Sequence, residues 1–189
     1  YFQVGAGGSV DFSSTAGTIS WWGMWDENAP HGRFWGQHDN FETRWSSGKL
    51  VLDFGGATAL ESTKSSWDEN HWYFFAITWN QNEDFLGIYW GDANEEPVED
   101  ASTTTWSGLI TGLLLENRIM NSERKNDPVR GSVDDFRHYT TQRTLEEIKS
   151  DYHKTITGNE PALSHYYRFE NDLVDSTGND DLRTSGSFS

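Results

Sequence analysis

The sequence predicts an all-β protein in which two antiparallel sheets pack as a jelly-roll sandwich, with one short helix near the C-terminal part. Many short aromatic and β-branched runs, separated by Gly, Asn, Asp and Ser, are typical of such strands. Helices do not alternate with the strands, which argues against a parallel α/β sheet. At 189 residues, the chain suits a single domain.

The strand candidates come at fairly even intervals along the chain. The segment 71–79 (HWYFFAITW) is apolar on both faces and is therefore expected in the centre of a sheet. The segments 33–38 and 41–46 predict a hairpin around Asp39-Asn40. The complete set, in chain order, is 9–12, 17–25, 33–38, 41–46, 49–54, 71–79, 85–90, 109–115, 131–139 and 163–169.

The first long strand (GTISWWGMW) illustrates how the tryptophans divide between two faces. Trp21 and Trp25 fall on one face and Trp22 falls on the other, because successive side chains of a strand alternate. Trp21, Trp72 and Trp79 lie within strong strand patterns, so we expect them in the core.

The helix has a well-defined start. Thr144 and Glu147 have the spacing of a capping box, in which Thr144 is the N-cap and Glu147 is the third helical residue. Ile148 and Tyr152 then fall on one helical face. Gly158 is the expected stop. A single short helix covers part of a sandwich and does not form a layer of its own.

Composition excludes several kinds of partner. The formal net charge of −16 repels phosphate backbones, so nucleic acid is not expected as a partner. The chain has no cysteine, which excludes disulfides, thiolate metal sites and cysteine nucleophiles. No apolar run is long enough for membrane insertion. Acidic, cysteine-free chains are common among bacterial surface proteins, and an extracellular or cell-surface location is the expectation.

Four segments together resemble one family. They are 17–22 (GTISWW), 71–78 (HWYFFAIT), 85–92 (FLGIYWGD) and 131–139 (GSVDDFRHY), which is followed by the helix. In this order they resemble the strands of laminin-G-like domains of the concanavalin A-like lectin and glucanase superfamily, of the kind found as modules in large bacterial surface proteins. The resemblance implies a lectin-like sandwich cut from a larger, multi-domain protein.

The C-terminal segment departs from that family pattern. HYYRFE at 165–170, followed by DSTGN at 175–179, resembles the strand and loop that usually open such domains, and here it comes last. We therefore expect residues 161–170 to form a closing strand of one domain that spans residues 1–189.

The resemblance also implies a structural Ca²⁺ ion. Its ligands are expected to be Asp134, Asp175 and Asn179, whose hard oxygen atoms suit calcium better than zinc. The alternative is that Asp134, expected at the margin of the core, accepts hydrogen bonds from backbone N–H groups without a metal.

A ligand site is expected at the loops that join strand ends, because the interior of the sandwich is filled. Exposed aromatic rings there suit stacking on sugars, while Asp, Asn and Arg side chains orient hydroxyl groups. The expected ligand is a glycan or cell-surface polysaccharide, and the expected rim is Trp25, Trp35, Trp45, Asp39, Asn40 and Arg44.

Catalytic motifs do not match. Glucanases of the superfamily carry E-x-D-x-x-E on one strand, and no strand here has this pattern; Glu95-Glu96 and Glu99-Asp100 flank a proline and are expected in a loop. The sequence therefore favours a non-catalytic carbohydrate-binding or adhesive module. A structural spacer repeat without a ligand, and a polysaccharide-cleaving enzyme of the same superfamily, are the alternatives.

Overall fold

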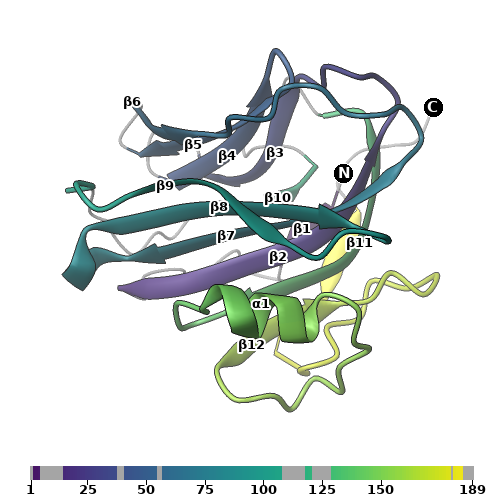
Figure 1. Ribbon diagram of the computed structural model, residues 1–189. Coiled ribbons are helices and arrows are strands. Elements are labelled where there is room, and N and C mark those ends of the chain that lie inside the picture. Colours follow the sequence, from purple (N-terminus) through teal and green to yellow (C-terminus); the bar gives the residue numbers. More distant parts are fainter. Residues whose placement is uncertain are drawn as a thin grey trace.

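The computed structural model describes residues 2–4, 15–37, 41–54, 57–107, 118–120, 129–179 and 181–184. In this part of the chain, two antiparallel sheets pack face to face, and an α-helix lies on the outer face of one of them (Figure 1). The predicted all-β jelly-roll sandwich with one short helix is confirmed. A helix long and apolar enough to cross a membrane does not occur in the described ranges.

The first sheet has the strand order β13-β1-β10-β3-β4-β5-β6. Its strands are β1 (Phe2–Val4), β3 (Gly32–Gln37), β4 (Phe41–Ser46), β5 (Lys49–Phe54), β6 (Ala57–Glu61), β10 (Arg118–Ile119) and β13 (Leu182–Thr184). The predicted hairpin is present, since β3 and β4 pair with Gln37 opposite Phe41. Its turn at Asp39-Asn40 lies outside the described residues.

The second sheet has the strand order β12-β11-β2-β7-β8-β9. Its strands are β2 (Ala16–Trp25), β7 (Trp72–Asn80), β8 (Phe85–Asp92), β9 (Val98–Thr103), β11 (Gly131–Tyr139) and β12 (Leu163–Tyr167), and a 3-10 turn (Gln81–Glu83) joins β7 to β8. The strand β7, apolar on both faces, pairs with β2 and β8 inside the sheet, as predicted.

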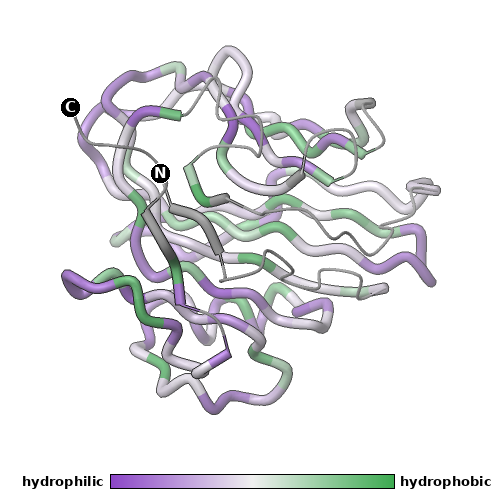
Figure 2. Tube along the Cα trace, turned by 180° about the vertical axis from the view of Figure 1, so that it is seen from behind, coloured by the Kyte–Doolittle hydropathy of each residue, from purple (hydrophilic) through white to green (hydrophobic). Residues whose placement is uncertain are grey.

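Aromatic rings from the two sheets interlock in the core. Trp21 of β2 stacks on Phe34 of the opposite sheet at 4.4 Å between ring centroids and on Phe75 of β7 at 5.4 Å. Stacked and edge-on rings add stabilisation beyond the area they bury. Hydrophobic residues accordingly recur along the strands, and hydrophilic residues dominate the connecting loops (Figure 2).

Three edge strands were not predicted. The strands β6 and β13 are the two edges of the first sheet. The strand β9, which contains Glu99 and Asp100, is an edge of the second sheet, so the expected loop at this acidic pair is wrong. An edge strand pairs on one side only, and its charged side chains can stay in water. Such a strand lacks the regular alternation of apolar and polar residues by which strands are recognised in a sequence. The predicted strands 9–12 and 109–115 lie outside the described residues.

The helix α1 (Leu145–Asp151) begins as predicted and ends earlier. Both hydrogen bonds of the capping box between Thr144 and Glu147 are present. Tyr152 is the C-cap, so the expected stop at Gly158 is wrong; Gly158 lies in the following loop. Ile148 is buried in a small apolar cluster with Phe74, which seats α1 on the outer face of the second sheet.

The C-terminal segment closes both sheets. The strand β12 pairs with β11, with Phe136 opposite Tyr167, and forms the edge of the second sheet. The strand β13 pairs with β1 at the edge of the first sheet. Tyr167 points into the core, and the ring of Tyr166 lies on the other face, against the guanidinium of Arg137. The segment 163–167 is therefore integral to the sandwich.

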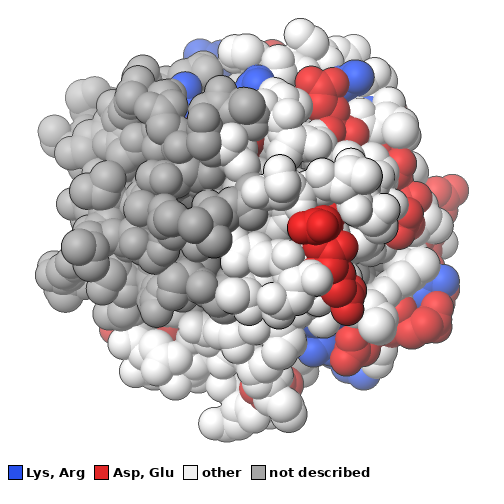
Figure 3. All heavy atoms as spheres, turned by 90° about the vertical axis from the view of Figure 1, so that its left-hand side faces the viewer, with Lys and Arg blue, Asp and Glu red and all other residues white. Residues whose placement is uncertain are grey.

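The surface is strongly acidic, as the 30 Asp and Glu residues against 14 Lys and Arg residues require. On the face seen in Figure 3, acidic side chains form several patches, and few basic side chains lie between them. The net negative charge of the molecule therefore attracts cationic ligands and repels anionic ones.

Candidate functional site

The tryptophans of the expected ligand rim lie in the core. The relative exposures of Trp25, Trp35 and Trp45 are 0%, 1% and 0%. Trp25 contacts Trp45 at 5.0 Å between ring centroids, and Trp35 contacts Phe41 at 5.1 Å. The expectation of a surface platform made of these rings is wrong, because all three occupy inward positions of their strands. Nearness to a strand end in the sequence does not expose a side chain when its face packs on the other sheet.

Arg44 is the one polar residue of that rim that the structure describes. Arg44 Nε lies 2.5 Å from Asp53 Oδ2 on the neighbouring strand β5, so its charge is already paired. Asp39 and Asn40 lie outside the described residues. The described part of the rim therefore offers one paired cation and no exposed ring.

The expected calcium ligands are not brought together. Asp175 is 2% exposed, and its Oδ1 atom accepts hydrogen bonds from the backbone N–H groups of Tyr166 and Thr177 at 3.0 and 2.9 Å. The Nδ2 atom of Asn179 donates to the carbonyl of Ser164 at 2.7 Å. The carboxylate of Asp175 thus holds its own loop in place.

Asp134 lies away from that loop. Phe136, Tyr167 and Asp175 are neighbours on three successive segments, so Asp175 is two strand spacings, about 9–10 Å, from Phe136. Asp134 is two residues further along β11 and is exposed, which corrects its expected place at the core margin. The described residues contain no group of three carboxylate or histidine side chains able to hold a metal. A calcium ion shared by Asp134, Asp175 and Asn179 does not fit this geometry, and calcium binding by the chain stays a prediction.

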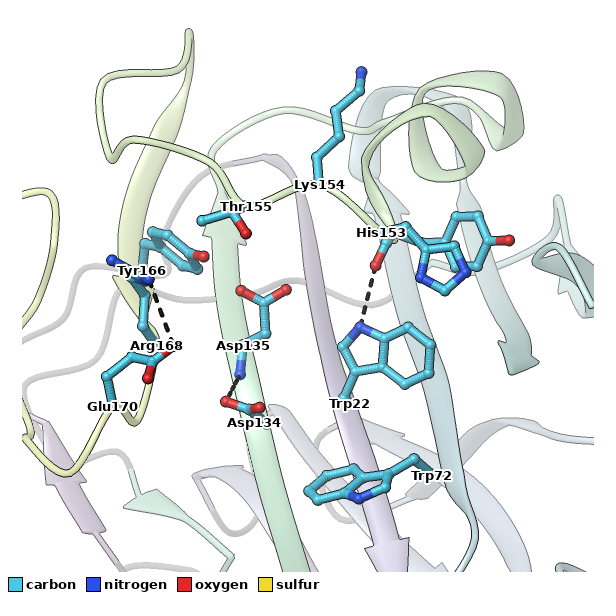
Figure 4. Close-up of a pocket in the computed structure, with 11 residues that line it drawn as sticks. Trp22, Trp72, Asp134, Asp135, His153, Lys154, Thr155, Tyr166, Arg168 and Glu170 are labelled. Atoms are coloured by element: carbon cyan, nitrogen blue, oxygen red, sulfur yellow. Dashed lines mark hydrogen bonds and ion pairs between the residues drawn. The ribbon is translucent and has the colours of Figure 1, made fainter. Parts of the chain in front are cut away.

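A different site lies on the outer face of the second sheet, beside α1. It is an open hollow of about 340 Å³ between β11, β7, β12 and the segment that follows the helix (Figure 4). Trp22 and Trp72 line one side, and Arg168 and Glu170 line the other. We refer to it below as the helix-side hollow.

A β-bulge places two consecutive carboxylates in the helix-side hollow. The register between β11 and β2 shifts between Asp134 and Arg137, so β11 holds one extra residue there. Asp135 adopts the left-handed conformation with φ of 53°, which is uncommon for a residue other than glycine. In a regular strand Asp134 and Asp135 would point to opposite faces, whereas the bulge turns both toward the hollow (Figure 4).

The buried Arg137 contacts three residues that line the hollow, Asp135, Lys154 and Tyr166. Its side chain is 1% exposed and forms an ion pair with Asp135. The guanidinium also donates to the carbonyl oxygens of Asp151 at 2.8 Å and Lys154 at 2.5 Å, and lies 5.4 Å from the centroid of the Tyr166 ring. One buried cation therefore contacts four positions in or beside the hollow, and two of these contacts are hydrogen bonds to carbonyls at the end of α1 and just after it.

The aromatic side of the hollow contains one covered ring and one open ring. The Trp22 N–H donates to the carbonyl of Tyr152 at 3.1 Å, and its ring stacks with His153 at 5.5 Å between centroids. Trp72 is half-buried, and in the described part of the chain its ring has no aromatic partner. The expectation that Trp72 belongs to the core is therefore wrong, because it occupies the outward position at the first residue of β7.

The surroundings of the Asp134 carboxyl raise its pKa. Although Asp134 is exposed, the chain around it removes part of the water from its carboxyl and so raises the pKa. The hydrogen bond from the Asp135 N–H and the charge of Arg168 lower the pKa, and the charges of Asp135 and Glu170 raise it. Burial and a hydrogen bond to the carboxylate of Asp135 also raise the pKa of the Tyr166 hydroxyl, which stays protonated as a donor.

Comparison with known proteins identifies the family. The family model described as the concanavalin A-like lectin/glucanases superfamily matches residues 1–149. This chain belongs to that superfamily. The resemblance inferred from the sequence motifs is thus confirmed, although no curated protein matches the sequence.

Solved structures share the fold at low sequence identity. A protein from Bacteroides ovatus described as a putative carbohydrate binding protein is similar over 98% of this chain and 56% of its own, with 19% identity and a TM-score of 0.75. The CBM40 of the Ruminococcus gnavus IT-sialidase, solved with α2,3-sialyllactose, is similar over 79% of this chain and 95% of its own, with 13% identity and a TM-score of 0.53. This chain spans little more than half of the Bacteroides ovatus protein.

The same fold also occurs in a catalytic domain. The enzymatically active domain of tailspike protein 2 from bacteriophage CBA120 is similar over 91% of this chain and 29% of its own, with 12% identity and a TM-score of 0.60. Carbohydrate-binding modules and an enzyme domain thus share this architecture, and the fold by itself does not decide between binding and catalysis.

The sequence contained one signal for the helix-side hollow. Alternation along β2 places Trp22 on the face opposite the core residues, which indicates an aromatic side chain on the outer face of the sheet. The bulge at Asp135 and the seating of α1 depend on contacts between distant segments, which no local pattern encodes.

Proposed function

We propose that this chain is a non-catalytic carbohydrate-binding module that holds a sugar in the helix-side hollow. The observation that carries the proposal is the open Trp72 indole, which lines the same hollow as the carboxylate of Asp134 and the guanidinium of Arg168. A flat apolar ring beside a few oriented polar groups suits a sugar, which has C–H-rich faces and hydroxyl edges.

The size and shape of the hollow support this role. Its volume of about 340 Å³ falls at the lower end of the range for small-molecule sites, about 300–1,000 Å³. A pyranose ring stacked on Trp72 would direct hydroxyl groups toward Asp134 as acceptor and Arg168 as donor. Because the hollow is open, each site binds weakly, and multivalent glycans or repeated modules gain affinity through avidity.

The arrangement of carboxylates favours binding over cleavage. A glycosidase needs two carboxyl groups on either side of the scissile bond, about 5–9.5 Å apart. Of the three carboxylates of the hollow, Asp134 and Asp135 are consecutive residues of one strand, and Asp135 is paired with Arg137. Glu170 lies on the other side and is 3.5 Å from Arg168. These positions suit the orientation of hydroxyl groups better than attack on a glycosidic bond from opposite sides.

A secreted or cell-surface location, with further modules in the same parent protein, completes the proposal. The net charge of −16 and the absence of cysteine support it, since such composition is common among bacterial surface proteins. The helix-side hollow, with its open indole and consecutive carboxylates, favours a binding module over a spacer repeat without a ligand.

A glycan array followed by calorimetry tests the proposal. We expect at least one glycan to bind the unmodified chain, and Trp72→Ala to abolish that binding while the melting temperature stays within a few degrees. Arg44→Ala is the matched control, because Arg44 lies on the other sheet and should leave binding unchanged.

Three results would contradict the proposal. Loss of binding in Arg44→Ala alone would move the site to the rim expected from the sequence. The absence of any bound glycan would favour the spacer alternative. Release of reducing sugar from a bound glycan would favour the enzyme alternative.

A further inference from the structure

The charges that line the helix-side hollow are not all balanced. Asp135 is paired with the buried Arg137. Arg168 lies 3.5 Å from Glu170, and Lys154 lies 3.7 Å from Asp151 while donating to Ser150 at 2.7 Å. Among the described lining residues, these contacts leave Asp134 as the one carboxylate without an ion pair, while the ring of His153 stacks on Trp22.

Asp134 has no counter-ion among the described residues. Its Oδ1 atom accepts one hydrogen bond, from the N–H of Asp135 at 2.8 Å, and no ion pair joins it to a basic side chain of the described ranges. Loss of part of its hydration, together with the charges of Asp135 and Glu170, raises the pKa of its carboxyl, and the Asp135 N–H and Arg168 offset this rise in part. The surroundings of Asp134 therefore disfavour its negative charge, and a bound cation would stabilise that charge.

The group facing Asp134 across the strand is aromatic. Asp134 pairs in register with Trp22, and the open ring of Trp72 lines the same hollow (Figure 4). An indole face attracts a cation through its quadrupole, and a nearby carboxylate attracts it through its charge. An uncharged hydroxyl group is stabilised by the carboxylate but not by the indole face. A carboxylate beside an indole therefore binds an ammonium group in preference to a hydroxyl group.

We propose that the helix-side hollow selects sugars that carry a free, protonated amine, with Asp134 as the counter-ion of the amine and Trp72 as the stacking surface of the ring. This inference rests on the proposed carbohydrate-binding function and narrows its ligand class. Acidic sugars are disfavoured, because the hollow has an unpaired carboxylate and the whole molecule carries a net charge of −16.

The test compares sugars that differ only in the charge at one position. Calorimetry is carried out on the full chain with glucosamine oligomers, the corresponding N-acetylglucosamine oligomers, glucose oligomers of equal length, and α2,3-sialyllactose. We expect the glucosamine oligomers to bind about tenfold or more tightly than the N-acetylated ones, since a hydrogen bond to a charged group is worth that much. Their affinity should also fall with added salt, whereas the affinity of neutral oligomers should not.

Two variants with the same change of charge identify the residue responsible. Asp134→Asn should remove the preference for the amine, so that glucosamine and N-acetylglucosamine oligomers bind alike. Glu170→Gln is the matched control, because Glu170 lines the same hollow but is already beside Arg168. It should retain most of the preference.

The outcomes separate this inference from the proposed function. Equal binding of aminated and acetylated oligomers, or tighter binding of sialyllactose, overturns the amine preference and leaves the carbohydrate-binding function intact. A preference retained in Asp134→Asn and lost in Glu170→Gln overturns the role of Asp134. If no sugar of any class binds, both proposals fall.

Discussion

Replacement of Arg137 by Met tests whether one buried guanidinium holds the helix-side hollow together. The change removes an ion pair to Asp135 and two hydrogen bonds to the carbonyls of Asp151 and Lys154. Breaking a buried ion pair by deleting one partner costs about 3–5 kcal/mol. Asp135 keeps 20% of its side chain exposed, so water compensates in part, and we expect a loss near about 3 kcal/mol.

Urea unfolding followed by tryptophan fluorescence measures this loss. A domain of this size has about 5–15 kcal/mol of stability, so the Arg137→Met variant should still fold. Arg44→Met is the matched control, since Arg44 pairs with Asp53 but keeps 29% of its side chain exposed, and should lose about 1 kcal/mol or less.

A second measurement locates the effect. Hydrogen exchange in the segment 151–155 should accelerate in Arg137→Met and not in Arg44→Met, because Arg137 donates to two carbonyls of that segment and Arg44 lies on the other sheet. A loss below about 1 kcal/mol, or a loss equal in the two variants, would refute the reasoning that Arg137 anchors the hollow.

Four further changes have distinct expected outcomes. Asp134→Asn should raise the urea midpoint at pH 7 and weaken ligand binding. Folding raises the pKa of the Asp134 carboxyl, so its ionisation destabilises the folded state as the pH rises above the ordinary pKa of 3.8. Asparagine carries no charge and avoids this destabilisation. A lower midpoint would contradict this sign. Asp175→Ala should cost about 2 kcal/mol or more, equally in Ca²⁺ and in chelator, because its carboxylate holds backbone N–H groups; a loss seen only with Ca²⁺ would establish calcium ligation by this residue. Thr144→Ala should cost about 1 kcal/mol in urea unfolding through loss of the capping box, and an unchanged midpoint would exclude this contribution. Trp45→Ala should cost about 3–5 kcal/mol, as expected for a ring with 0% exposure, and loss of glycan binding without loss of stability would return it to a surface site.

Most strands and the start of the helix were predictable because their signals are local. Alternation in 17–25 placed Trp21 and Trp25 on one face and Trp22 on the other, and the structure confirms this division. The capping box at Thr144 is a contact between residues three positions apart, so its sequence pattern suffices. The edge strand β9 was not predicted because one of its edges faces water, so its sequence does not need to alternate between apolar and polar residues.

The candidate site depends on contacts that span the chain. Whether Trp45 or Trp72 is exposed depends on which strand face the opposite sheet covers, and proximity to a strand end carries no information on this point. The extra residue at Asp135 is a matter of register between β11 and β2, which are more than a hundred residues apart.

The sequence by itself determined the sandwich, the order of most of its strands and the capped helix, because side-chain alternation and capping act over a few residues. Only the tertiary structure decided the position and lining of the candidate site. The buried Arg137 joins β11 to the end of α1, and the bulge turns Asp134 and Asp135 to one side. Such an arrangement is selected by the packing of segments distant in the chain, and that packing leaves no periodic pattern to read.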